Sequence, residues 1–181
     1  MTRRRAEMFV PDDEDPRAGA PATGDELPML AGMLSGQRAT LALKCAGLGA
    51  ELARRSVPPS TLSLLGLVRH LADVERRWFR QVLAGEDAPL RYASGVEPDG
   101  DFDGAIGDPA VVADAWRAWR DEVAYADRFV ATAPDLDVTG DDSWRGTVSL
   151  RWVLLHLIEE YARHNGHADL LRERIDGARG V

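Results

Sequence analysis

Apolar residues recur at spacings of three and four residues in four segments of the chain, and this is the period of an amphipathic α-helix. These segments cover residues 26–46, 62–85, 109–132 and 149–177. No stretch alternates between apolar and polar residues long enough to indicate a strand, and the short run "DVTG" is too weak to count as one. The pattern therefore predicts an all-α fold.

Residues typical of helix ends support these boundaries. Asp108 can cap the third helix, and Pro109 suits its first position because that position needs no backbone donor. Gly85 is a suitable residue to end the second helix. Gly32 and Gly36 weaken the prediction of the first helix, because glycine is a poor helix former.

The connection between the second and third helices, residues 86–107, lacks periodicity and is rich in turn-forming residues. A connection this long is often functional or joins distant helix ends. Four amphipathic helices with a long crossover between helices 2 and 3 predict a four-helix bundle over residues 26–181. Residues 1–25 are rich in charge, proline, glycine and alanine and predict a flexible N-terminal arm.

Composition excludes several classes of protein. The chain of 181 residues suits one domain, and its net charge of −8 argues against binding nucleic acid. Its one cysteine, Cys45, permits no intramolecular disulfide and lies where the first helix predicts a core residue. No stretch approaches the roughly 20 apolar residues of a membrane span, and the start lacks the apolar region of a secretory signal. We therefore expect a cytoplasmic protein with no membrane partner.

The stretch "HLIEEYARHNGH", residues 156–167, holds three of the four histidines of the chain. On a helix, His164 falls on the apolar stripe that should be buried, and Glu160 lies one turn earlier at its edge. A buried imidazole beside a carboxylate has two explanations, a structural ion pair or a shared divalent cation. This helix alone does not decide between them.

The second helix supplies a possible third ligand. His70 borders the apolar stripe of that helix, where a lone histidine is more often a core residue than a ligand. With Glu160 and His164 it would complete three nitrogen or oxygen ligands, and three protein ligands with an open position are typical of catalytic zinc sites. Asp73 could be a fourth ligand, although an outer-shell or surface role is favoured.

At these motifs a family resemblance appears. The stretches "LSLLGLVRHLADVERRWF" and "SLRWVLLHLIEEYARHNGHADLLRERIDG" resemble the DinB-like superfamily, in an actinobacterial branch, over nearly all of the chain from about residue 27. The resemblance implies a four-helix bundle with a long second crossover. Many members bind a metal through three histidines. Here the matching positions are His70, Glu160 and His164, a set similar to that of the mycothiol-dependent maleylpyruvate isomerases.

The resemblance also implies a function. Characterised relatives use mycothiol or bacillithiol. We therefore expect a metal-dependent enzyme that transfers such a thiol to a small electrophile, or that uses the thiol to isomerise the electrophile. Zinc is the expected metal, with nickel or iron as alternatives. Mycothiol is expected because the alanine, arginine and glycine content indicates a high-GC genome. Family analogy favours a homodimer. The alternatives are a binding module without turnover and a bundle that serves only in association.

Weaker candidates surround the proposed ligands. Arg163 and Asn165 could contact substrate if the helix end lines a cavity. His167 lies where many relatives carry glutamine, so we expect it to lie beside the metal site without binding the metal directly. Trp144 and Arg145 precede the fourth helix, in a loop that can overhang the site.

Overall fold

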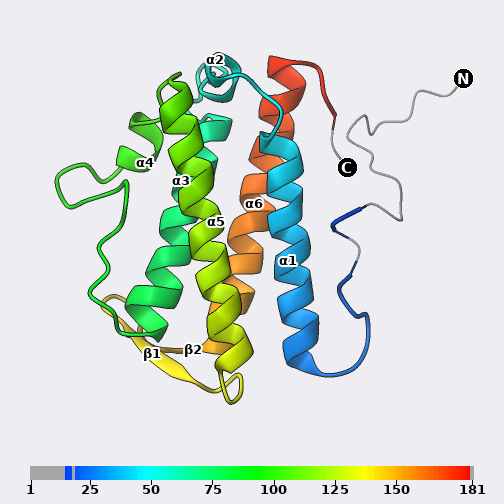
Figure 1. The fold of residues 1–181 in the computed structure, drawn as a ribbon, viewed down its shortest axis with the longest axis vertical. Coiled ribbons are helices and arrows are strands. Elements are labelled where there is room, and N and C mark those ends of the chain that lie inside the picture. Colours follow the sequence, from blue (N-terminus) through cyan, green and yellow to red (C-terminus); the bar gives the residue numbers. More distant parts are fainter. Residues whose placement is uncertain (1–14, 18, 180–181) are drawn as a thin grey trace, which may run out of the picture.

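The computed structural model describes residues 15–17 and 19–179 (Figure 1). In that part of the chain the structure is mostly helical, with one two-stranded hairpin, which confirms the all-α class. Much of the predicted arm, residues 1–14 and 18, lies outside the described residues. Among the described helices, none is both long and apolar enough to cross a lipid bilayer.

Four long helices form the body of the molecule. They are α1 (Glu26–Cys45), α3 (Leu64–Arg76) with its π-helical continuation η1 (Arg77–Leu83), α5 (Pro109–Thr132) and α6 (Leu150–Ile175). α1 packs mainly on α6, and α3 packs mainly on α5. Figure 1 shows that α1 and α6 run in one direction and that α3 and α5 run in the opposite one. This is the predicted four-helix bundle with a long second crossover.

Three of these helices begin at residues whose side chains cap them. The Ser63 hydroxyl accepts a hydrogen bond from the Gly66 N–H, and the Asp108 carboxylate accepts one from the Ala110 N–H. The Ser149 hydroxyl does the same at the start of α6. Each bond satisfies a backbone donor that has no partner within the helix. The predicted starts of α5 and α6 are confirmed, and α3 begins two residues later than predicted.

The expectation that the chain has no strand was wrong. Strands β1 (Thr139–Asp142) and β2 (Gly146–Ser149) form an antiparallel hairpin before α6. Such short, polar strands give no periodic signal, and tertiary contact holds them. A Cβ atom at Gly140 would meet the Val82 carbonyl oxygen at 2.0 Å, so only glycine lets β1 lie this close to η1.

The crossover between η1 and α5 is more ordered than its sequence indicates. It contains the short helix α4 (Gly100–Asp103), and α2 (Ala50–Ala53) is a second short helix that periodicity did not predict. Each has four residues, about one helical turn, which is too short to show a repeating apolar pattern. The Arg69 guanidinium, from α3, donates to the carbonyl oxygens of Asp101 at 2.8 Å and Gly100 at 2.9 Å. These bonds tie α4 to the middle of α3.

A buried polar network joins the four long helices. The Arg38 guanidinium on α1 donates two hydrogen bonds of 2.7 Å to the fully buried Glu75 carboxylate on α3. The Tyr161 hydroxyl on α6 donates to Glu75 at 2.8 Å and accepts from the Trp119 indole on α5 at 2.8 Å. Around it, apolar side chains from the predicted stripes fill the core, among them Leu34, Leu41, Leu67, Leu71, Leu154 and Leu157.

The two glycines that weaken the first helix have a packing role. A Cβ atom at Gly32 would lie 2.8 Å from the Ala20 Cα atom, and one at Gly36 would lie 3.3 Å from the Arg17 carbonyl oxygen. The described part of the N-terminal segment therefore runs close against α1.

Candidate metal centre

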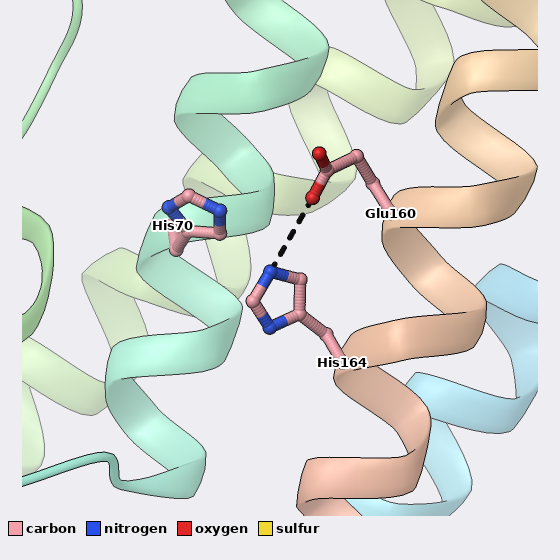
Figure 2. A group of neighbouring side chains, drawn as sticks. All are labelled: His70, Glu160 and His164. Carbon is pink, nitrogen blue, oxygen red and sulfur yellow. Dashed lines mark ion pairs between the residues drawn. The ribbon is translucent and has the colours of Figure 1, made fainter.

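Three side chains meet between α3 and α6. Figure 2 shows His70 from α3 and Glu160 and His164 from α6 pointing into the same space. Each offers one ligand atom, and these atoms all lie within 4.8 Å of one another. Two ligand atoms on one tetrahedral zinc ion lie about 3.4 Å apart, since each bond is near 2.1 Å. Shifts of roughly 1 Å would thus bring the three ligand atoms into bonding geometry. We call the residues His70, Glu160 and His164 the metal trio.

Helix geometry brings the trio together. Glu160 and His164 are four residues apart, so their side chains lie on the same side of α6. The Glu160 Oε2 and His164 Nε2 atoms are 3.5 Å apart. The rings of His70 and His164 meet edge to face, with centroids 4.8 Å apart. The predicted candidates therefore converge across the interface of α3 and α6.

Asp101 orients His70 from the crossover. Its carboxylate lies 2.7 Å from the His70 Nδ1 atom, and its side chain is 7% exposed. The Phe102 ring stacks on the His70 ring at 5.1 Å. A proton on Nδ1 donates to Asp101 and leaves the Nε2 lone pair for a cation, which is how carboxylates commonly support metal-binding histidines. Sequence reasoning missed Asp101, because the acidic run "DGDFDG" carries no periodicity that would place one of its residues.

The donor chemistry fits a cation. His164 is mostly buried, and burial first, then the charges of His70, His167 and Arg163, lower its pKa to about 3. His164 is thus neutral near pH 7. Its Nδ1 atom lies 3.4 Å from the His167 Nδ1 atom, and the tautomer protonated at that position donates there. In that tautomer the bare Nε2 faces the Glu160 carboxylate 3.5 Å away, so two acceptors meet without a proton between them. A shared divalent cation would remove the repulsion between these two acceptors.

The weaker candidates occupy different places. The three backbone N–H groups of residues 91–93 donate to the Asp73 carboxylate at 2.7 to 3.0 Å, so Asp73 anchors the crossover and does not join the trio. The Asn165 amide donates to the Gln37 side chain at 2.8 Å and to its carbonyl oxygen at 3.0 Å, which ties α6 to α1. His167 and Arg163 remain beside the trio.

The trio lies in the wall of an open cavity of about 540 Å³. The turn of the β1–β2 hairpin borders this cavity with Trp144 and Arg145, in agreement with the prediction that their loop overhangs the site. His156 also lines it, stacked on the Trp152 ring at 4.8 Å and 3.7 Å from Glu160. Burial lowers the pKa of His156, the charges of Glu160 and Glu159 oppose this shift, and those of Arg145 and Arg163 add to it. The lining side chains are Leu62, His70, Val74, Arg77, Trp78, Phe102, Trp144, Arg145, His156, Glu160, Arg163, His164 and His167.

A helical bundle with this connectivity, and with two histidines and a glutamate gathered between its second and fourth long helices, is the arrangement that the resemblance to the DinB-like class implied. The family model of the mycothiol S-transferases matches residues 29–177, and the chain belongs to this family of transferases. The match spans all four long helices and the whole trio. Among curated proteins, none matches this sequence.

Proposed function

We propose that this protein transfers mycothiol to a small electrophile, with a divalent cation held by His70, Glu160 and His164. The observation that carries the proposal is the convergence of these three ligands in the wall of an open cavity. Membership of the mycothiol S-transferase family supports mycothiol as the thiol. Isomerisation of an electrophile with the same thiol is a variant of this proposal, in which the thiol is recovered.

Four residues of the candidate centre have distinct roles in this proposal. His70 and His164 present imidazole nitrogens, Glu160 supplies the negative charge, and Asp101 holds the His70 ring in place. Three ligands leave coordination positions open. Zinc fits this donor set best, and nickel or iron would also bind it. A bound divalent cation would stabilise the thiolate form of mycothiol, which is the nucleophilic form.

The reaction needs no nucleophile from the protein. The thiol loses its proton to solvent, its sulfur forms a bond to the electrophilic carbon, and the leaving group departs with its electron pair. Cys45 is buried, and burial raises the pKa of its thiol to about 12. It therefore stays protonated and buried within α1. We infer a cytoplasmic setting in which mycothiol and a small electrophile are the partners and the thiol is kept reduced.

The test compares two adjacent glutamates. Protein purified without chelator is loaded with zinc, and loss of mycothiol is followed with a panel of alkyl halide and epoxide electrophiles. Glu160→Gln should lose bound zinc and at least about a hundredfold in kcat/KM, because it removes a charged ligand. Glu159→Gln, on the exposed side of the same helix turn, should keep both.

The outcomes separate the proposal from its alternatives. Zinc bound at the trio with no thiol consumed by any electrophile would indicate a binding module and contradict the transferase proposal. Equal zinc content in the two variants would instead contradict the assignment of Glu160 as a ligand.

A further inference from the structure

The cavity beside the trio is positively charged although the chain as a whole is acidic. Arg77, Arg145 and Arg163 line it, and Glu160 is the one carboxylate among the described residues of its wall. The net charge of the chain, in contrast, is −8. A cleft lined by one sign of charge concentrates ligands of the opposite sign. This cavity therefore favours anions.

Two of the three arginines are available to a ligand. The Arg77 guanidinium is paired with the buried Asp142 carboxylate at 2.7 Å. The Arg145 and Arg163 side chains make no hydrogen bond or ion pair with any residue that the structure describes. Both guanidinium groups border the same cavity, Arg145 from the hairpin turn and Arg163 from α6.

The hairpin turn holds Arg145 in place. The Asp142 carboxylate accepts hydrogen bonds from the backbone N–H groups of Trp144 at 3.1 Å and Arg145 at 2.8 Å. The Arg145 Cζ atom lies 4.7 Å from the Trp144 ring centroid and 5.0 Å from the Trp152 ring centroid. Aromatic rings attract the faces of a guanidinium, and its five N–H donors point outward in its plane. The edge of Arg145 is thus free to bind an oxyanion through two bonds.

The rest of the cavity is suited to an apolar body. Trp78, Val74 and Leu62 line it beside Phe102, and Trp144 is 78% exposed at its edge. A volume of about 540 Å³ accommodates a molecule the size of a substituted benzene ring together with part of the thiol.

We propose that the electrophile of this enzyme is an aromatic or similarly apolar carboxylic acid, whose carboxylate binds Arg145 and Arg163 while its reactive carbon faces the metal trio. This inference rests on the proposed function for the reaction, but the recognition of the acid can be tested without turnover.

The binding test uses an unreactive acid and its neutral amide. 4-Methylbenzoate should quench the tryptophan fluorescence of the zinc-loaded protein with a Kd at least about tenfold lower than that of 4-methylbenzamide, because only the acid can form charge-assisted bonds. Arg145→Met should weaken binding of the acid at least about tenfold and Arg163→Met at least about threefold. Arg120→Met, a matched loss of charge on the exposed face of α5, should leave it unchanged.

Other results of the binding test would overturn the proposed recognition of the carboxylate. Equal affinity for the acid and the amide would overturn the inference, as would binding that survives Arg145→Met. Binding that survives Arg145→Met and is lost in Glu160→Gln would assign the carboxylate to the trio, which also overturns it. Far-ultraviolet circular dichroism confirms that each variant is folded.

The reaction test pairs 4-(chloromethyl)benzoate with its methyl ester. In both, the mycothiol sulfur bonds to the benzylic carbon, chloride leaves with the bonding pair, and the thiol proton goes to buffer. The acid should have the higher kcat/KM, and Arg145→Met should lower that of the acid by at least about tenfold and that of the ester less than about twofold. Turnover of the ester with no advantage for the acid would refute the inference and leave the transferase function standing. Binding of the acid at Arg145 without turnover of either compound would contradict the transferase function and leave the recognition of the acid standing.

Discussion

At the scale of single residues, the orientation of His70 depends on one carboxylate from outside the helix pair. Asp101 lies 2.7 Å from the His70 Nδ1 atom and reaches it because Arg69 ties the backbone of α4 to α3. This contact selects which ring nitrogen faces Glu160 and His164. The carboxylate thus belongs to the candidate centre although it need not touch the cation.

Replacing Asp101 by asparagine tests that role. We expect Asp101→Asn to weaken zinc binding about 10- to 100-fold, since outer-shell partners of ligand histidines have effects of this size. The neighbouring exposed variant Asp103→Asn should bind zinc as the unmodified protein does. Competition with a chromophoric chelator measures both affinities. Equal affinities for zinc would show that His70 needs no support from Asp101.

The three candidate ligands could be predicted from the sequence, whereas their supporting residue could not. Glu160 and His164 lie within a periodic helix, so their spacing fixes their relative position. Asp101 and Asp73 illustrate the limit of this reasoning. One supports His70 from an irregular crossover, and the other, within α3, turns to that crossover instead of the trio. Contacts made by irregular backbone follow from tertiary packing and leave no pattern in the sequence.

At the scale of elements, the long helices follow from periodicity and caps, but the hairpin depends on packing. Its strands have four residues each and few apolar side chains. Gly140 allows β1 to lie against η1, and the turn then carries Trp144 and Arg145 to the cavity. The sequence could suggest a loop over the site but not the paired strands that place it.

A pair of glycine substitutions tests this dependence on packing. Gly140→Ala should destabilise the protein by about 1–3 kcal/mol, because the added methyl group meets the backbone of η1. Gly166→Ala should stabilise it by about 0.5–1 kcal/mol, since that helical position is open and alanine is the better helix former. Denaturation in urea measures both free energies of unfolding. A Gly140→Ala protein as stable as the unmodified one would mean that β1 does not need its close approach to η1.

At the scale of the whole molecule, the buried network around Glu75 links the four long helices. A charge pair this deep leaves a costly unpaired ion when one partner is lost. The same network fixes α3 relative to α6, and these are the two helices that carry the trio. Global stability and the geometry of the candidate centre are therefore connected through one set of contacts.

Glu75→Gln tests the contribution of that network. We expect a loss of about 3–5 kcal/mol in the free energy of unfolding, because Arg38 stays buried without its main counter-charge. Asp127→Asn, which removes the exposed partner of the same arginine, should cost less than about 1 kcal/mol. Thermal or chemical denaturation separates these values, and similar losses in the two variants would contradict a special role for the buried pair.

The most direct test of the account is a crystal structure of the protein purified without chelator and supplied with zinc, with anomalous data collected on both sides of the zinc absorption edge. The account predicts one strong peak between α3 and α6, about 2.0–2.2 Å from a ring nitrogen of His70, a carboxylate oxygen of Glu160 and a ring nitrogen of His164. An edge-specific peak elsewhere, or none at the trio under saturating zinc, would contradict it.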